Sequence, residues 1–294
     1  MLKHSSQLPK FESDQFELKL ISLGLDNVLD NYVLTSNINT ITHLNVSFEN
    51  ISDLTGIEDF TALTNLWCND NNLVNLDVSD LINLVRLECQ WNFINSLDVS
   101  QNTALVTLDC GANYLTSLDV SQNINLTLLA CYGNNLSSLD VSHLSNLFSL
   151  VCGWNNISSL DLSHNTNLTQ LHCQWNELIT LDVRNGNNTN LVAFWANDNA
   201  NLNCTDVDDP SYMYSNWGNN ITPPNSFSGN CSGLGCTNPA ACNYDPYASI
   251  NDGSCQLPDG CTDPLACNYD SEAICDDGSC GYVNGCTDPN SCNY

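Results

Sequence analysis

Basic residues are nearly absent from this sequence. Its 294 residues include five Lys and Arg together against 33 Asp and Glu, which gives a formal net charge of −28. Beyond Lys19, the remaining side chains of this kind are Arg86 and Arg184. Proteins that bind a nucleic-acid backbone or an anionic membrane surface need clustered Lys and Arg to meet the negative charge. The composition therefore excludes nucleic acid and anionic membranes as partners.

Long apolar runs are also lacking, while cysteine is plentiful. No stretch approaches the roughly 20 apolar residues of a transmembrane helix, so we predict no membrane insertion. The start, MLKHSSQLPKFESD, lacks the apolar stretch of a signal peptide. Of 17 cysteines, six are evenly spaced and eleven follow residue 203, in a segment too poor in large apolar residues to form a core. That second group indicates disulfides and an oxidising compartment. We expect an extracellular or outer cell-surface protein whose signal peptide is missing from this sequence.

Catalytic motifs are absent as well. An enzyme needs a nucleophile, a base and a stabilising group that converge on one site. The sequence contains no H-E-x-x-H, no G-x-S-x-G and no phosphate-binding glycine loop. We therefore predict that the protein is not an enzyme, and we assign no catalytic residue, no cofactor and no metal site to the main part of the chain.

A repeat of 21 residues dominates what is present. The block LTNLWCNDNNLVNLDVSDLIN, residues 63–83, is followed by LVRLECQWNFINSLDVSQNTA and LVTLDCGANYLTSLDVSQNIN. In LTNLWC, Leu66 and Cys68 alternate with Asn65 and Trp67, which is the period of a strand with one buried face. A single short strand cannot bury that face, so successive copies must stack into a parallel solenoid with a continuous Leu, Val and Cys core. Copies begin at Ile41, Leu63, Leu84, Leu105, Leu126, Leu147, Leu168 and Leu191.

Three further positions recur in each copy. The lattice cysteines should be buried thiols that act as small apolar residues, with a metal or disulfide ladder as the alternative. The lattice asparagines should satisfy backbone groups where the chain leaves each strand. The aspartates of the L-D-V-S motif repel one another, so backbone N–H groups of the adjacent turn, or a bound cation, must offset the repulsion. These sets are Cys68, Cys89, Cys110, Cys131, Cys152 and Cys173; Asn71, Asn92, Asn113, Asn134, Asn155, Asn176 and Asn199; and Asp77, Asp98, Asp119, Asp140, Asp161 and Asp182.

The pattern L-x-x-L-x-C-x-x-N-x-L-x-x-L-D-V-S resembles the leucine-rich repeats of secreted proteins from Bacteroidetes-type bacteria. The resemblance implies an α/β-type solenoid dominated by parallel β-strands, a right-handed arc with a short helical N-terminal cap, followed by a small disulfide-rich loop tail. We predict a disordered start at 1–10, an N-terminal cap at 11–40, repeats of period 21–23 at 41–199 and a C-terminal cap at 200–232. The cysteine-rich repeats follow at 233–294.

The tail has its own repeat of 25 residues. GCTNPAACNYDPYASINDGSC, residues 235–255, and GCTDPLACNYDSEAICDDGSC, residues 260–280, resemble GCTDPxACNY…DDGSC modules near the C-terminus of similar secreted proteins. Those proteins often carry a sorting signal after the last module; none is visible here, and the third copy stops at Tyr294, so we interpret the tail as truncated.

Comparison of the copies suggests how the tail cysteines pair. We predict Cys236–Cys255, Cys261–Cys280 and Cys267–Cys275, which leaves Cys242 either free or paired between modules. A Cys204–Cys231 disulfide should close the C-terminal cap. The closely spaced Asp and Asn residues of the modules suit Ca²⁺, but they suit turn formation equally well, so calcium in 233–294 stays an open alternative.

The variable positions point to a function. Five of the six tryptophans stand at positions that, by the resemblance, line the concave ligand surface of a leucine-rich repeat arc. Exposed aromatic side chains among amides and carboxylates are typical of recognition surfaces; the alternative is that they pack between successive coils. The predicted ligand-binding residues are Trp67, Arg86, Glu88, Trp91, Asp109, Tyr132, Trp154, His172, Trp175 and Trp195.

We therefore expect a secreted or cell-surface, non-catalytic protein that binds an extracellular protein ligand on this face. Two alternatives stay open. The same aromatic residues would suit polysaccharide binding and adhesion, or the chain would be a structural spacer of a longer secreted enzyme. The sequence predicts no particular oligomeric state.

Overall fold

The computed structural model describes residues 13–222, 225–231, 234–236, 238–242, 244, 250–251 and 255–281. The chain forms two compact units, Met1–Gly229 and Asn230–Tyr294, and each is considered by itself. The disordered start predicted for 1–10 lies outside the described residues. The division between the units falls three residues before the predicted end of the C-terminal cap.

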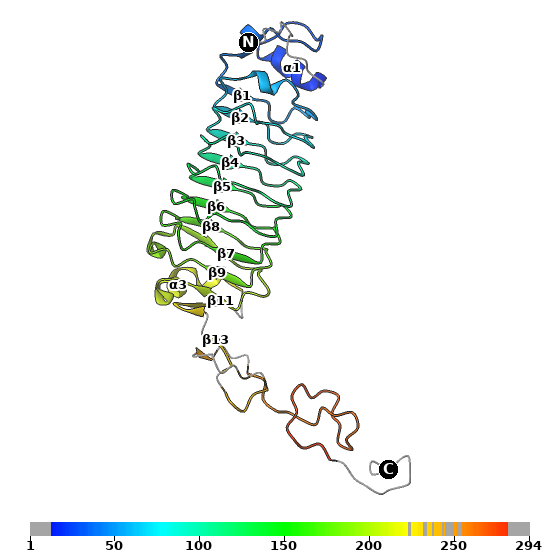
Figure 1. Ribbon diagram of the computed structural model, residues 1–294, viewed down its shortest axis with the longest axis vertical. Helices are drawn as coiled ribbons and strands as arrows, with labels where there is room; N and C mark the ends of the chain where they lie inside the picture. Colours follow the sequence, from blue (N-terminus) through cyan, green and yellow to red (C-terminus); the bar gives the residue numbers. More distant parts are fainter. Residues whose placement is uncertain are drawn as a thin grey trace, which may run out of the picture. The chain divides into compact units, whose positions relative to one another are not determined.

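The first unit is a solenoid in which each coil contributes one strand of three residues to a parallel sheet (Figure 1). The sheet order is β1-β2-β3-β4-β5-β6-β8-β10, so the strands follow one another in chain order along the stack. Equivalent lattice positions are in register: Leu44 pairs with Leu66, and Leu66 pairs with Leu87. The strands are β1 His43–Asn45, β2 Asn65–Trp67, β3 Arg86–Glu88, β4 Thr107–Asp109, β5 Leu128–Ala130, β6 Ser149–Val151, β8 Gln170–His172 and β10 Ala193–Trp195.

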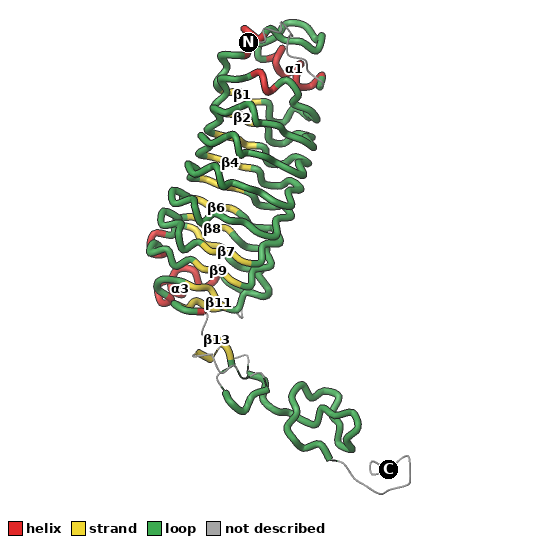
Figure 2. Tube along the Cα trace, viewed as in Figure 1, coloured by secondary structure: helices red, strands yellow, loops and turns green. Residues whose placement is uncertain are grey.

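A second parallel sheet is built from the L-D-V-S side of the last coils. Its order is β12-β11-β9-β7, and it comprises β7 Ser159–Asp161, β9 Thr180–Asp182, β11 Cys204–Asp206 and β12 Ser226–Ser228. The rest of each coil runs through turns and loops (Figure 2). The described strands of the solenoid are therefore short and connected mostly by non-helical segments.

The core follows the lattice. The middle residue of every strand in the large sheet is buried, and so are all six lattice cysteines, which are 0% exposed. The six thiols carry no disulfide. Burial raises the pKa of each thiol, for Cys152 to about 12, so these side chains stay protonated. The predicted solenoid with a Leu, Val and Cys core is confirmed.

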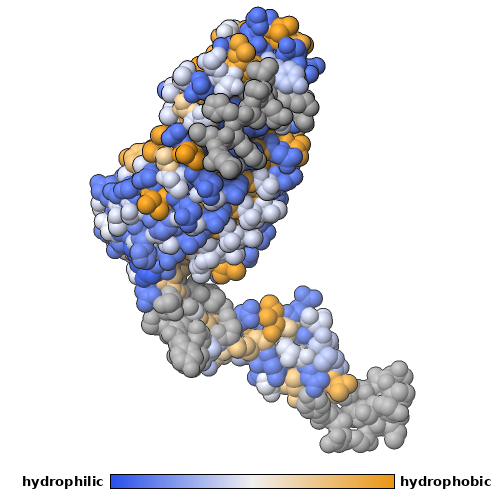
Figure 3. All heavy atoms as spheres, turned by 45° about the horizontal axis from the view of Figure 1, so that its top comes forward, coloured by the Kyte–Doolittle hydropathy of each residue, from blue (hydrophilic) through white to orange (hydrophobic). Residues whose placement is uncertain are grey.

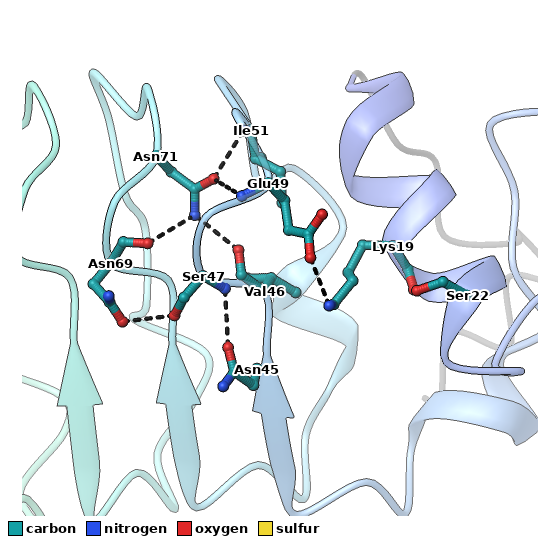
Figure 4. Close-up of polar contacts among 9 residues, drawn as sticks. All are labelled: Lys19, Ser22, Asn45, Val46, Ser47, Glu49, Ile51, Asn69 and Asn71. Carbon is teal, nitrogen blue, oxygen red and sulfur yellow. Dashed lines mark hydrogen bonds and ion pairs between the residues drawn. The ribbon is translucent and has the colours of Figure 1, made fainter.

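The N-terminal end of the stack is covered by α1 Asp14–Ser22, which is followed by the short helices α2 Thr35–Ile38 and η1 Ile57–Asp59. Phe16 of α1 is fully buried, with its ring centroid 6.3 Å from that of Phe60. Lys19 of the same helix forms an ion pair with Glu49 at 2.6 Å, which ties the helix to the first coil (Figure 4). A short helical N-terminal cap was predicted, and it is present.

The C-terminal end is covered by α3 Pro210–Trp217, flanked by η2 Asn188–Asn190 and η3 Gly218–Asn220. Asp209 caps α3 by accepting hydrogen bonds from the N–H groups of Ser211 and Tyr212. The ring of Phe227 in β12 contacts Phe194 of the last coil at 5.8 Å, so aromatic packing closes the core. No described helix has the length and apolar character that crossing a bilayer requires.

The second unit has little regular structure in its described part. It contains β13 Leu234–Gly235, β14 Ile250–Asn251 and isolated bridges such as that between Cys261 and Tyr269. Cys236–Cys255 and Cys261–Cys280 form disulfides, which confirms those two predictions. Cys204 and Cys231 are both disulfide-bonded, and the pairing between them stays a prediction.

The predicted Cys267–Cys275 disulfide is wrong, because Cys275 pairs with Cys242 of the preceding module. The segment between the modules brings these two residues together. The N–H of Cys242 donates to the carbonyl of Gln256 at 2.9 Å, and the N–H of Cys275 donates to the carboxylate of Asp259 at 3.0 Å. The N–H of Cys267 instead bonds the carbonyl of Gly281 at the far end of its module.

The tail aspartates accept hydrogen bonds from nearby backbone groups. Asp263 accepts from the N–H of Leu265 at 2.9 Å, and Asp270 accepts from that of Glu272 at 2.9 Å. Asp277 accepts from the N–H of Ser279 at 2.8 Å. These contacts are those of the turn interpretation; calcium binding by the tail stays a prediction.

Candidate binding surface

Eight of the ten predicted ligand-binding residues fall into two rows that run along the solenoid, one residue per coil, while Arg86 and Tyr132 lie outside both rows. The first, which we call the strand row, is the position directly after the central Leu or Phe of the strands from β2 to β10 in the large sheet. The strand pairings place its members side by side at the roughly 4.8 Å spacing of neighbouring strands. It consists of Trp67, Glu88, Asp109, Ala130, Val151, His172 and Trp195.

The second row, which we call the turn row, lies three residues further along each coil. All of its members have a positive φ, between 49° and 62°. It consists of Asp70, Trp91, Ala112, Gly133, Trp154, Trp175 and Asp198. A bulky residue in this left-handed region is uncommon, and such a conformation costs of order 1–3 kcal/mol. The turn row therefore holds three tryptophans in a conformation that the fold itself must impose.

The tryptophans of the turn row are largely exposed. Trp91 is 58% exposed, Trp154 51% and Trp175 52%. The core beneath them is already filled by the leucines and the lattice cysteines. Packing between successive coils, the alternative role for these residues, accounts for at most the buried half of each side chain. The exposed half of each tryptophan side chain is an apolar surface that a ligand can contact.

Asparagines fix the backbone that carries both rows (Figure 4). The Oδ1 of Asn71 accepts hydrogen bonds from the N–H groups of Glu49 at 3.1 Å and Ile51 at 2.9 Å. Its Nδ2 donates to the carbonyls of Val46 at 2.8 Å and Cys68 at 3.0 Å. The same pattern repeats in the following coils, so each amide joins two coils at the point where the chain leaves the strand. This confirms the role predicted for the lattice asparagines.

The aspartates of the L-D-V-S motif behave as expected on the other side of the coil. Asp98 accepts from the N–H of Ser100 at 2.8 Å, and Asp119 accepts from that of Ser121 at 2.8 Å. These hydrogen bonds lower the pKa of both carboxyl groups. Backbone N–H groups therefore offset the repulsion between neighbouring aspartates of this motif, which was one of the two predicted explanations. A cation bound along it stays a prediction.

Tyr132 contacts the neighbouring coil on the candidate binding surface. Its ring lies over Gly111, where an added Cβ would come within 2.3 Å of the tyrosine Cε1. A larger residue at that position would require the Tyr132 ring to move. Burial raises the pKa of Tyr132, and the nearby Asp109 adds to the effect.

A hollow lies between the turn row and the aromatic residues two positions beyond it. Its volume is about 520 Å³. The rings of Phe93 and Tyr114 stack at 6.1 Å along one side, and Trp91 forms another. Ala112 and Gly133, the small members of the turn row, also line it. We name this feature the aromatic hollow.

Phe93 and Tyr114 are not among the predicted ligand-binding residues. They follow the lattice asparagine, at a variable position that is Asn, Glu or Ala in other coils. The presence of aromatic residues at the same lattice position in two adjacent coils is a sequence feature by which this part of the surface could have been found. Their exposure, 46% and 56%, shows that they are not core residues.

Charge on the strand row is concentrated near its N-terminal end. Arg86 forms an ion pair with Glu88 at 2.5 Å, and its guanidinium lies over the ring of Trp67 at 5.9 Å. Asp109 is next in the row; burial raises its pKa to about 6, and Glu88 contributes to the same shift. The structure therefore brings an aromatic ring, a cation and two carboxylates together.

The C-terminal end of the rows is less acidic. The ring of His172 lies 6.3 Å from that of Trp195, and burial lowers the pKa of this histidine. Trp154 and Trp175 are neighbours in the turn row. The predicted residues thus divide into two groups, one around Trp91 and Tyr132 and one around Trp175 and Trp195, with Ala130 and Val151 between them in the strand row.

The surface carries a surplus of negative charge. Every Lys and Arg in the described part of the chain is engaged within its own unit: Lys19 with Glu49, Arg86 with Glu88, and Arg184 with Asp182. Figure 3 shows a mostly hydrophilic surface on which apolar residues form separate patches.

Comparisons with known proteins show what the fold resembles. No protein-family model and no curated protein matches the chain. Among solved structures, the functional domain of InlJ from Listeria monocytogenes, described as including a cysteine ladder, matches with a TM-score of 0.54 and 29% identity. That match covers 72% of this chain and 56% of the InlJ chain. Internalin C2 from the same organism matches with a TM-score of 0.59 and 19% identity, over 75% of this chain and 94% of that one.

The chain spans little more than half of the InlJ structure that it matches, so the activity of that whole protein is not carried over. Both matches agree with the solenoid fold described above, and the cysteine ladder named for InlJ is similar to the row of lattice cysteines. The first unit is a leucine-rich repeat solenoid, and it is followed by a disulfide-rich region.

Proposed function

We propose that this protein is a non-catalytic recognition protein that binds an extracellular protein ligand through the strand row and the turn row. The observation that carries the proposal is the turn row itself. Three tryptophans are held there in left-handed backbone conformations, and more than half of each is exposed. Strained and exposed residues on a rigid scaffold are typical of functional sites.

The architecture supports the same proposal. A solenoid presents equivalent positions of successive coils as one extended surface, which is how repeat proteins bind large partners. The asparagine ladder holds these positions rigidly, so little conformational entropy is lost when a ligand binds. Aromatic side chains beside carboxylates and amides supply the anchors and polar contacts of protein interfaces. The disulfides of the second unit support an extracellular location.

The test compares two triple variants of the full chain on an array of extracellular proteins and an array of glycans. Trp91→Ala, Trp154→Ala and Trp175→Ala together remove the exposed tryptophans of the turn row. Ile82→Ala, Ile124→Ala and Ile179→Ala together remove equally exposed apolar side chains, 59%, 59% and 61% exposed, that lie outside both rows. We expect a protein ligand whose affinity falls at least a hundredfold in the first variant and is kept in the second.

Two results would overturn the proposal. If the tryptophan variant binds as well as the unmodified chain, then the rows are not the binding surface. If glycans are bound and proteins are not, then polysaccharide recognition is the correct function. Circular dichroism of both variants checks that the solenoid is intact.

A further inference from the structure

The aromatic hollow exists because the turn row is interrupted by small residues. Trp91, Trp154 and Trp175 occupy the same lattice position as Ala112 and Gly133. A tryptophan is therefore compatible with this backbone conformation, yet two adjacent coils lack one. The space left open, about 520 Å³, is bounded by Trp91 and by the stacked pair Phe93 and Tyr114. It is large enough for a long side chain and its flanking backbone.

A carboxylate lies beside this space and no basic residue lines it. Asp70, the neighbour of Trp91 in the turn row, is among the residues that line the hollow. One of its oxygens accepts a hydrogen bond from the Nδ2 of Asn69 at 2.7 Å. The described basic side chains of the unit, Lys19, Arg86 and Arg184, form ion pairs outside the hollow. An anionic group entering the hollow would be repelled, and a cationic group would be attracted.

A neighbouring cluster shows what such an arrangement binds. At the strand row, Trp67 provides an aromatic face, Arg86 a guanidinium 5.9 Å above it, and Glu88 a carboxylate 2.5 Å from that guanidinium. The aromatic hollow offers the same two protein components, aromatic faces and a carboxylate. The cation is the component that its own residues do not supply.

We propose that the aromatic hollow receives a Lys or Arg side chain from a basic segment of the protein ligand. The cation lies against the faces of Trp91 and Tyr114, where the ring quadrupole attracts it, and its charge is met by Asp70. This inference rests on the proposed function, since it assumes a protein ligand, and it adds the chemistry of one anchor.

The experiment uses the full chain and a pair of synthetic nonapeptides that differ only in two positions, arginine in one and the uncharged isostere citrulline in the other. Binding is followed by the NMR signals of the indole N–H groups, with the Trp91 signal assigned from Trp91→Phe. We expect the arginine peptide to shift the Trp91 signal at millimolar concentration and to bind about tenfold more tightly than the citrulline peptide, a ratio typical of a cation–π contact with a carboxylate nearby.

Variants test the hollow itself. Ala112→Trp fills it with a residue that the same lattice position accepts in three other coils, and it should abolish the shift. Asp70→Asn should remove most of the preference for arginine. The matched controls are Asp80→Asn, an exposed carboxylate outside the hollow, and Ile124→Ala; both should bind the arginine peptide as the unmodified chain does.

Equal binding of the two peptides, an unaltered response in Ala112→Trp, or no response of Trp91 to the arginine peptide would each overturn the proposal. A peptide that shifts the signals of Trp154 and Trp175 while leaving that of Trp91 unchanged would overturn it as well, but would leave the proposed protein recognition by the rows intact. If a neutral oligosaccharide displaces the arginine peptide and no protein does, then both the cation site in the hollow and protein recognition by the rows are contradicted.

Discussion

The two units of this protein are stabilised in different ways. In the solenoid, leucines from successive coils form one continuous core, and six cysteines take part in it as unlinked thiols. In the described part of the second unit, the buried hydrophobic residues are alanines and cysteines only: Cys236, Ala241, Cys261, Ala266 and Cys275. Larger apolar residues there, such as Leu265 and Ile274, are 86% and 71% exposed.

The comparison shows that the same residue type has two roles within one chain. A cysteine on the 21-residue lattice packs as a small apolar side chain because stacked neighbours already bury it. A cysteine in the tail is a covalent link, because too little apolar surface is buried there to offset the entropy of ordering the chain. Context, and not the residue, decides which role applies.

The largest effect should come from breaking the amide ladder. The Oδ1 of Asn134 accepts from the N–H of Leu115 at 2.9 Å, and its Nδ2 donates to the carbonyls of Cys110 and Cys131 at 3.1 and 3.0 Å. Asn134→Ala leaves the buried N–H of Leu115 without its acceptor and removes one of the two amide donors from each carbonyl. We therefore expect the free energy of unfolding to fall by about 3 kcal/mol.

Urea unfolding followed by circular dichroism measures this loss. The matched control is Asn135→Ala, which removes an exposed amide one residue away and should change stability by less than about 0.5 kcal/mol. Equal effects of the two substitutions would show that the ladder does not stabilise the solenoid.

Reduction should separate the two units. We expect a reducing agent to destabilise the second unit, where each disulfide contributes about 2–4 kcal/mol by restricting the unfolded chain. Amide hydrogen exchange should therefore rise in residues 234–281. Residues 41–199 should keep their protection, because no disulfide lies within them. Loss of protection in the repeats under the same conditions would contradict the assignment of the lattice thiols as packing residues.

A smaller effect concerns Asp109 on the strand row. Burial raises the pKa of its carboxyl group to about 6 in the folded chain, from 3.8. Because the folded state holds this proton more tightly, stability is fully present below the unfolded pKa of 3.8 and is lost as the pH rises through the folded pKa of about 6. Asp109→Asn should raise stability at pH 7.5 by about 1–2 kcal/mol and change it little below the unfolded pKa, at about pH 3. Thermal unfolding at the two pH values measures the difference; a gain of equal size at both would rule out ionisation as the cause.

The smallest effect should come from the exposed aspartate ladder. Hydrogen bonds from Ser121 lower the pKa of Asp119 below its value in the unfolded chain. The stabilisation is therefore present above the unfolded pKa and is lost as the pH falls through the folded one. Asp119→Ala should lower the unfolding midpoint slightly at pH 7 and not at pH 2.5. If the midpoint falls equally at both, the hydrogen-bonded carboxylate is not responsible.

Much of the solenoid was predictable because its contacts are periodic. The spacing of Leu66 and Leu87 specifies which residues become neighbours, since every coil contacts the next in the same way. The binding rows were predicted for the same reason, and Trp67, Trp91 and Trp175 lie in them. The aromatic hollow was not predicted, because it depends on deviations from the repeat at Phe93 and Tyr114.

The tail shows where prediction from the repeat ends. Disulfides that stay inside one module, such as Cys236–Cys255, follow from comparing copies. The pairing of Cys242 with Cys275 crosses from one module to the next, and it depends on the path of the segment that includes Gln256 and Asp259. Nothing in the spacing of the cysteines specifies that path.

By itself, the sequence determined the period of the coils, the buried positions of Leu and Cys, and the line along which the tryptophans lie, since all three depend on contacts between identical neighbours. The tertiary structure alone decided the left-handed conformation of the turn row, the position of the Tyr132 ring over Gly111, and the aromatic hollow. The left-handed conformation recurs at a position held by Asp, Trp, Ala or Gly, so the residue types at that position do not reveal it. The other two features depend on how unlike side chains from different coils fit together, which a repeating pattern does not encode.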